Sequence, residues 1–313
     1  MKSRLWWSLP WLLATAQAQA IGAGEIRPLI ADGSHAVAPG CAVAAFRDGR
    51  QILSTSAGLA DLDTGRAIDG TTLFYAASVS KQFTALAVAQ LAVSGRIDLD
   101  GDVRRYIPEL PVYTHTVTPR MLLHHTAGIA DWLSLAAMSG AKDWGALDRA
   151  QALALVVARP DTAFEPGTRF EYSNGGYLLL AEIVARTSGQ SFADYMRTQV
   201  FAPIGMRDAF FLDGARPDGD RVAHGYLPDG DGFVVRDTYP LIGGSGGLML
   251  SADDLARYEY DIEVGHVVWT DAVRDIMLAP AHLLDGSAAG MPSGLGYAGG
   301  LRVGERNGQH VVE

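Results

Sequence analysis

The stretch SVSKQFTALAVAQLAV, residues 78–93, decides the fold. Its residues are almost all apolar, and they cover every side of a helix wound at about 3.6 residues per turn. A helix with so little polar surface is typical of the centre of a domain, where neighbouring elements cover it all round. Gly95 follows two residues later and is predicted to end the helix. The stretch therefore predicts a buried central helix, with the rest of the 313 residues arranged around it.

Two polar residues at the start of this helix could carry chemistry. Ser78 and Lys81 are three residues apart, so a helix places both side chains on one face and within reach of each other. A serine that attacks a carbonyl group needs a nearby base to take its proton. Lysine can be that base only where burial lowers its pKa, and the apolar helix supplies such surroundings. We predict Ser78 as a nucleophile and Lys81 as its base.

The use of lysine in this chain supports the prediction. The only lysines are Lys2, Lys81 and Lys142, and every other cation is an arginine, which cannot give up its proton. A second copy of the pattern, Ser139-Gly140-Ala141-Lys142, lies in a short loop-like stretch and is predicted to be solvent-exposed. The alternative for Lys81 is a side chain whose stem lies on the protein while its ammonium reaches water. Ser80 points to another side of the helix and is predicted to be structural.

Tyr172-Ser173-Asn174 is the second candidate element, and it directly precedes a predicted helix. A tyrosine held close to a lysine ammonium can share its proton and act as a general base. An asparagine two positions later can present its amide to a substrate carbonyl. The alternative is an asparagine that caps the helix, beside a packed tyrosine. Because Ser78 and Lys81 are also present, we favour the catalytic interpretation.

Three further patterns resemble known kinds of site. Residues 243–247 (GGSGG) fit the G-x-S-x-G nucleophile elbow around Ser245, but Leu248-Met249-Leu250 separates them from the next helix, so a close-packed loop is predicted. His124-His125 are adjacent on a loop, which suits a metal poorly, and the sequence contains no HExxH pattern. Residues 98–102 place glycine wrongly for a calcium-binding loop. We predict no metal and no cofactor.

Strands are predicted at both ends of the chain and helices in the middle. Three β-hairpins are indicated, pairing residues 41–47 with 51–58, 222–227 with 233–237, and 297–305 with 309–313. Helices are predicted near 147–158, 175–187 and 191–200, and from the capping box at 251–254 through Tyr258. We predict an α/β (α+β) fold in one domain, residues 21–313. Its antiparallel sheet is formed by the N- and C-terminal strands and flanked by helices, and a mainly helical region is inserted.

The first twenty residues are typical of an export signal. A basic start, Lys2 and Arg4, precedes an apolar segment at 5–14 and the small-residue pattern Ala18-Gln19-Ala20. A periplasmic or secreted location is therefore predicted. The formal net charge is −10, and removing Lys2 and Arg4 makes it −12, a balance that repels nucleic acid and anionic membranes. No later window of about 18 uninterrupted apolar residues occurs, so stable membrane insertion is not expected.

Together these residues resemble the serine β-lactamase and penicillin-binding superfamily, and specifically its class C-like branch of esterases, D-peptidases and related hydrolases. The resemblance runs from about Pro39 to the last residue, with motifs in order at 72–74, 77–84, 122–128, 166–174, 246–248 and 251–256. It implies that Ser78 is the acylated nucleophile, that Lys81 and Tyr172 form the proton-transfer pair, and that Asn174 contacts substrate. It also implies an oxyanion hole formed by the Ser78 backbone N–H and one N–H of a core strand.

The superfamily has a third motif, Lys-Thr-Gly or His-x-Gly, on a central strand. The sequence reaches Val311-Val312-Glu313 where that motif would begin, so we expect the domain to be C-terminally incomplete. The resemblance implies a small-molecule or peptide-like substrate with an ester, amide or β-lactam carbonyl, and it does not choose among them. Two alternatives remain open: a relative that binds peptidoglycan or β-lactams without turnover, and an α/β-hydrolase that uses Ser245.

Overall fold

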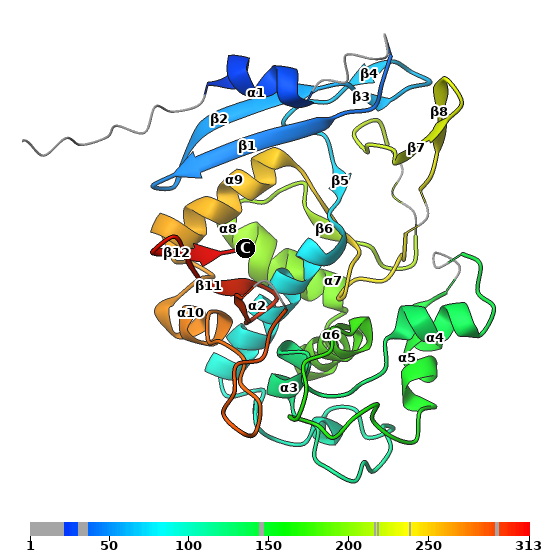
Figure 1. Cartoon of the computed structure of the whole chain (residues 1–313), viewed down its shortest axis with the longest axis vertical. Coiled ribbons are helices and arrows are strands. Elements are labelled where there is room, and N and C mark those ends of the chain that lie inside the picture. The colour runs from blue at the N-terminus through cyan, green and yellow to red at the C-terminus, as the bar shows by residue number, and fades with distance from the viewer. Residues whose placement is uncertain are drawn as a thin grey trace, which may run out of the picture.

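The computed structural model describes residues 22–30, 37–143, 147–215, 217, 219–237, 239–291 and 294–313. Residues 1–20, for which an export signal is expected, lie outside these ranges. The described residues form a mixed α/β structure of helices and small antiparallel sheets, drawn in Figure 1. The expected fold class is confirmed.

Helix α2 (Ser80–Val93) runs through the middle of the molecule (Figure 1). Ten of its fourteen residues are buried, and it packs against α6 (Asn174–Ser188) and α10 (Asp271–Met277). The predicted central helix is therefore confirmed, but its first turn differs. Ser78 lies in a 3-10 turn, Ala77–Val79, that leads into the helix and sets the serine just before the helix begins.

The three predicted hairpins are present, but two have other bounds than predicted: the strand expected at 222–227 begins at Tyr226, and the strand expected at 297–305 pairs in its hairpin only from Arg302. They pair β1 (Cys41–Arg47) with β2 (Arg50–Ala57), β7 (Tyr226–Asp229) with β8 (Gly232–Val235), and β11 (Arg302–Arg306) with β12 (Gln309–Val312). Asp48 and Gly49 have φ values of 51° and 66°, as a tight turn between twisted strands requires. Asn307 and Gly308, with φ values of 53° and 75°, make the same kind of turn.

The strands at the two ends of the chain do not pair with each other in the described residues. β1 and β2 form a sheet of their own, while β10 (Gly296–Tyr297), β11 and β12 form a second one. Different helices support the N-terminal hairpin, because α1 (Ala23–Ile30) packs on β2 and α9 (Ala252–Tyr260) packs on β1. The single sheet expected from both termini is thus divided into two separate sheets.

A small third sheet, which the sequence did not predict, positions the start of α2. Its strands are β5 (Phe74–Tyr75), β9 (Leu248–Leu250) and β6 (Phe210–Phe211), in the order β5-β9-β6. β5 ends three residues before Ser78, and β9 follows the glycine-rich loop at 243–247. The sheet therefore brings these two distant segments of the chain together. Two further short strands, β3 (Leu59–Asp61) and β4 (Arg66–Ala67), pair with each other.

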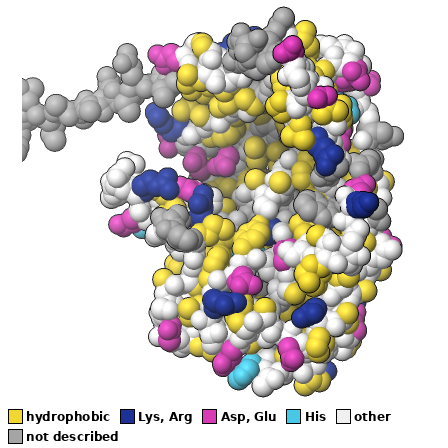
Figure 2. Space-filling model, turned by 45° about the vertical axis from the view of Figure 1, so that its right-hand side comes forward, with side chains coloured by type: hydrophobic (Ala, Val, Ile, Leu, Met, Phe, Trp, Pro, Cys, Tyr) yellow, Lys and Arg dark blue, Asp and Glu magenta, His cyan; other side chains and the backbone are white. Residues whose placement is uncertain are grey.

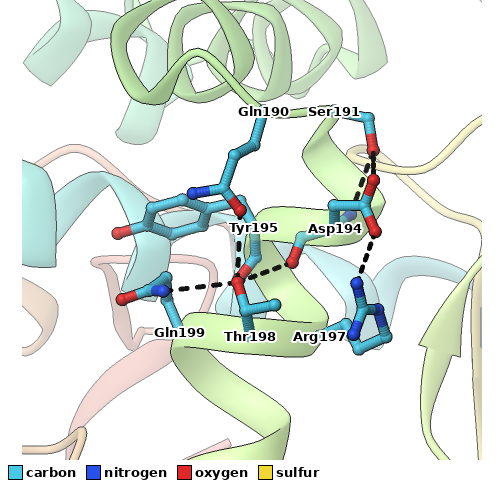
Figure 3. A network of polar contacts seen from close by, with 7 residues as sticks. All are labelled: Gln190, Ser191, Asp194, Tyr195, Arg197, Thr198 and Gln199. Atoms are coloured by element: carbon cyan, nitrogen blue, oxygen red, sulfur yellow. Dashed lines mark hydrogen bonds and ion pairs between the residues drawn. The ribbon is translucent and has the colours of Figure 1, made fainter.

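The middle of the chain is helical, as expected. It contains α3 (Pro119–Leu123), α4 (Trp132–Met138), α5 (Arg149–Val157), α6, α7 (Phe192–Tyr195) and α8 (Ala202–Ile204). A π-helical segment, Met196–Phe201, continues α7. Figure 3 shows the surface network at this junction, where the Thr198 hydroxyl donates to the Asp194 carbonyl at 2.9 Å and Arg197 pairs with the Asp194 carboxylate.

Acidic and basic side chains lie interspersed over the face drawn in Figure 2, with hydrophobic side chains between them. None of the helices in the described part of the chain combines the length and apolar character needed to cross a membrane.

Candidate active site

Ser78 lies where the β5-β9-β6 sheet meets α2. The residue before it, Ala77, has a φ of 43°, a left-handed conformation that costs energy for any residue with a Cβ atom. The Ser78 Oγ lies 3.3 Å from the Lys81 Nζ and accepts a hydrogen bond from the Tyr172 hydroxyl at 2.9 Å. The structure thus brings together three of the four predicted site residues around one oxygen.

Lys81 is only 1% exposed, so its ammonium does not reach water and the snorkelling alternative is wrong. Its Nζ lies 2.8 Å from the Asn174 Oδ1 and 2.7 Å from the Ser245 carbonyl oxygen, besides its longer contact with Ser78. Burial lowers the pKa of Lys81 from 10.5 to about 7, and the negative charge of Asp131 acts in the opposite direction. Near neutral pH the amine therefore exists partly without its extra proton.

The contacts of Lys81 define where its lone pair points. The two short contacts go to oxygens that can only accept a hydrogen bond, so a neutral amine directs both of its N–H bonds at Asn174 and Ser245. The remaining direction faces the Ser78 Oγ at 3.3 Å. This geometry allows the nitrogen to accept the serine proton.

Tyr172 donates its hydroxyl proton to the Ser78 Oγ. Burial raises the pKa of Tyr172 above its usual value of 10, because the phenolate would lose hydration. The Lys81 Nζ lies 4.6 Å from the centre of the Tyr172 ring and so faces the ring of the tyrosine. At neutral pH this arrangement favours a neutral Tyr172 that donates a hydrogen bond, while Lys81 is the stronger candidate for the base.

Asn174 is the first residue of α6 and joins Lys81 to Asp131. Its Oδ1 accepts from Lys81, and its Nδ2 donates to the Asp131 carboxylate at 2.7 Å. The helix cap is Ser173, whose Oγ accepts from the Gly176 N–H, so the alternative of an Asn174 cap is wrong by one residue. Asn174 therefore contacts both the proposed base and a carboxylate, and the lining of the pocket beside Ser78 does not include it.

Sequence reasoning missed two groups in the site. Asp131 is the N-cap of α4, and the only signal for it is an aspartate three residues before Ser134 at a helix start. The Ser245 carbonyl is a backbone group and has no residue-type signal at all. Its position depends on the fold of the glycine-rich loop at 243–247.

Ser245 itself lacks the geometry of a nucleophile elbow. A strand, β9, follows the glycine-rich loop where an elbow requires a helix. The Ser245 Oγ is buried and accepts a hydrogen bond from the Trp132 indole at 3.2 Å. The second SxxK copy is also unlike the first, because Ser139 and Lys142 are both exposed.

Of the two adjacent histidines, His125 contacts the segment that carries Tyr172 and Asn174. The His125 Nδ1 accepts the backbone N–H of Ser173 at 3.1 Å, and its Nε2 lies 3.0 Å from the Tyr297 hydroxyl. Burial lowers the pKa of His125 well below 6.5, so the ring is neutral at physiological pH. His124 is buried as well, and its pKa is lowered to about 4, mainly by desolvation.

A pocket of about 470 Å³ opens onto this group. Its lining includes Ser78, Lys81, Tyr172, Met291 and Tyr297. A larger cavity of about 850 Å³ lies beside α9 and α10 and includes none of the four predicted site residues. Three of the four predicted site residues therefore line the smaller pocket and none lines the larger one.

Comparisons with known proteins identify relatives of the chain. The sequence model of the family described as Beta-lactamase matches residues 26–311. A D-aminopeptidase from Brucella anthropi is 31% identical over 284 residues, which are 86% of this chain and 51% of that protein. The chain spans about half the length of the curated relatives it matches.

Two solved structures share the fold. The octameric penicillin-binding protein homologue from Pyrococcus abyssi superposes with a TM-score of 0.72 at 25% identity, covering 87% of this chain and 62% of that chain. A D-stereospecific amidohydrolase from Streptomyces sp. has a TM-score of 0.69 at 23% identity, covering 87% of this chain and 80% of that chain.

Proposed function

Since the chain belongs to the beta-lactamase family, we propose that it is a serine hydrolase that forms an acyl intermediate on Ser78. The observation that carries this proposal is the buried Lys81 amine, which donates to two carbonyl-type oxygens and directs its third position at the Ser78 Oγ. A pKa of about 7 makes this amine a base at neutral pH.

The proposed reaction proceeds in two halves. The Ser78 Oγ attacks the substrate carbonyl carbon and passes its proton to the Lys81 Nζ, while the Ser78 backbone N–H faces the developing oxyanion. As the bond to the leaving group breaks, that group takes the proton from the Lys81–Tyr172 pair. Water then attacks the acyl carbon and passes a proton to the Lys81 Nζ; the bond between the acyl carbon and the Ser78 Oγ breaks, the Oγ takes that proton back, and the acid is released.

We propose an amide or short peptide of a D-amino acid as the substrate class. The support comes from relatives: a D-aminopeptidase is 31% identical over 86% of this chain. In this proposal the carbonyl of such a substrate lies in the pocket lined by Ser78, Lys81 and Tyr172. Esters and β-lactams offer the same kind of carbonyl and are the competing classes.

Intact-protein mass spectrometry with a fluorophosphonate probe tests the nucleophile. We expect one adduct on the wild type and none on Ser78→Ala, with labelling retained in Ser139→Ala and Ser245→Ala. Ser139 is a matched control, because it is the serine of the exposed SxxK copy. An adduct that persists in Ser78→Ala and disappears in Ser245→Ala would overturn the proposal.

A substrate panel separates the classes. D-alanine p-nitroanilide, its L-enantiomer, p-nitrophenyl acetate and a chromogenic cephalosporin each report one class. We expect the D-anilide to be cleaved faster than the L-anilide, and Ser78→Ala to lose at least about 10³-fold in kcat/KM. Binding of the cephalosporin with no turnover of any compound would instead support a binding protein.

A further inference from the structure

We propose that Asp131 is a positioning residue that fixes the Asn174 amide and thereby holds the Lys81 amine against Ser78. This inference rests on the proposed function, because it assigns Asp131 a task in the same proton transfer. It acts through Asn174, and no direct contact with a substrate is involved.

The contacts of Asp131 tie two helices together. Its Oδ2 accepts both the backbone N–H and the side-chain Nδ2 of Asn174, each at 2.7 Å. Its Oδ1 accepts the Ser134 backbone N–H at 2.9 Å and so caps α4. One carboxylate therefore satisfies the start of α4 and the first N–H of α6 at once.

The carboxylate also determines which way the Asn174 amide faces. In the observed orientation the amide N–H₂ meets Asp131, and the amide oxygen meets Lys81. A flipped amide would place its oxygen against the Asp131 carboxylate and its N–H₂ against the Lys81 amine, and neither contact is a hydrogen bond when the amine is charged. Because Asp131 can only accept, it holds the amide oxygen on the lysine side.

Close packing prevents Asp131 from moving away. Gly175, next to Asn174 on α6, lies so near the Ala130 carbonyl oxygen that a Cβ atom there would overlap it. The chain at 130–131 is thus pressed against the first turn of α6. One position before Asn174, the Ser173 N–H donates to the His125 Nδ1. Residues 125–131 therefore contact the start of α6 at two places, at Ser173 and at Gly175.

The charge of Asp131 acts on Lys81 as well. The titratable groups that face the amine are Asp131, the rings of Tyr172 and Tyr177, and His125. Burial raises the pKa of both tyrosines and lowers that of His125, so all three are neutral at physiological pH. Asp131 is the charge that opposes the effect of burial on Lys81. Its removal should lower the pKa of Lys81 further.

The test is the pH dependence of Ser78 labelling by a fluorophosphonate, followed by intact mass. In Asp131→Asn we expect the labelling rate to fall about 10–100-fold near its plateau. We expect the pH at which the labelling rate reaches half of its plateau to fall by about one unit. Asp148→Asn makes the same charge change at the exposed cap of α5 and should keep both the wild-type rate and the wild-type pH profile. If Asp131→Asn does not fold, Asp131→Ser takes its place, since serine also caps helices.

A double-mutant cycle tests whether Asp131 acts through Asn174. In the Asn174→Ala background, replacing Asp131 should have less than about a third of its effect on the labelling rate in the wild type. A pH profile of Asp131→Asn that matches Asp148→Asn, or full additivity with Asn174→Ala, would overturn the inference. If either result occurs while the adduct still forms on Ser78, the proposed function is unaffected. If the probe labels another residue instead of Ser78, the proposed function itself is wrong.

Discussion

The side chain of Lys81 is almost wholly buried, so the stability of the protein should depend on pH. Burial lowers its pKa from 10.5 to about 7. Between those pH values the unfolded chain holds a proton on this amine that the folded protein has released. The cost of burying Lys81 is therefore present in full below about pH 7 and disappears as the pH rises toward 10.5.

We expect the free energy of unfolding of the wild type to increase relative to that of Lys81→Met as the pH rises. The gain should be about 1.4 kcal/mol for each pH unit inside that window, measured as the difference in free energy of unfolding in urea at about pH 7.5 and about pH 9.5. The exposed Lys142→Met is the control and should show no such gain. A difference that stays constant with pH would mean that Lys81 is charged in the folded protein.

Tyr172 supplies the second hydrogen bond to Ser78, at 2.9 Å. Tyr172→Phe removes it, and we expect the rate of Ser78 labelling to fall about 10²–10⁴-fold. The rise of that rate near pH 7 should remain, because the proposed mechanism assigns the base to Lys81, whose pKa is lowered to about 7. Tyr113→Phe, a half-buried tyrosine outside the pocket lining, serves as the control. A loss of the rise near pH 7 in Tyr172→Phe would contradict this division of roles.

The sequence predicted which side chains lie together in the site, but it did not predict the residue that positions them. Ser78, Lys81, Tyr172 and Asn174 lie together as expected. Asp131 was not predicted, because an aspartate at a helix start is common and its second contact, with α6, depends on tertiary packing.

In the first turn of helix α6, the neighbouring glycines Gly175 and Gly176 differ in the space available for a side chain. A Cβ atom at Gly175 would overlap the Ala130 carbonyl oxygen, whereas one at Gly176 would lie 3.5 Å from its nearest neighbour. Gly175→Ala should therefore destabilise the protein by about 1–3 kcal/mol and slow Ser78 labelling, since it pushes Asp131 away from Asn174.

Gly176→Ala is the matched control for this prediction. It places the same side chain in the same helix, where alanine is favoured over glycine by up to about 1 kcal/mol. We expect unchanged or increased stability in urea denaturation and unchanged labelling. Equal behaviour of the two variants would show that the contact between residues 130–131 and α6 does not govern the site.

The elements that the sequence predicted well have strong local signals. The turns at Asp48-Gly49 and Asn307-Gly308 need positive φ at both residues, which few residue pairs allow. β5 and β6 are two residues long, too short to show any alternation of polar and apolar residues, so the β5-β9-β6 sheet could not be predicted.

For the whole molecule, the core around α2 should dominate stability. Leu86 is 0% exposed, and Val112 on the surface is 77% exposed. Leu86→Ala should lower the free energy of unfolding by about 2–5 kcal/mol, through lost burial and the cavity left behind. Val112→Ala should stay within about 0.5 kcal/mol of the wild type. Similar losses in both variants, measured in urea, would contradict a core centred on α2.

The order of strands and helices along the chain predicted the fold class, but it did not predict how the hairpins sit. β1–β2 and β11–β12 are separate sheets, since strand pairing between distant segments depends on the edges that packing leaves side by side. Local signals along one chain do not contain that information.

An NMR titration of protein labelled with ¹³C at the lysine Cε tests directly whether Lys81 can be the base for Ser78. The chain contains only three lysines, so the Lys81 signal can be assigned by its loss in Lys81→Met. We predict that this signal titrates with a midpoint of about 7, far below the usual value of 10.5. A midpoint at or above 10 would show that Lys81 stays protonated at neutral pH and cannot be the base for Ser78.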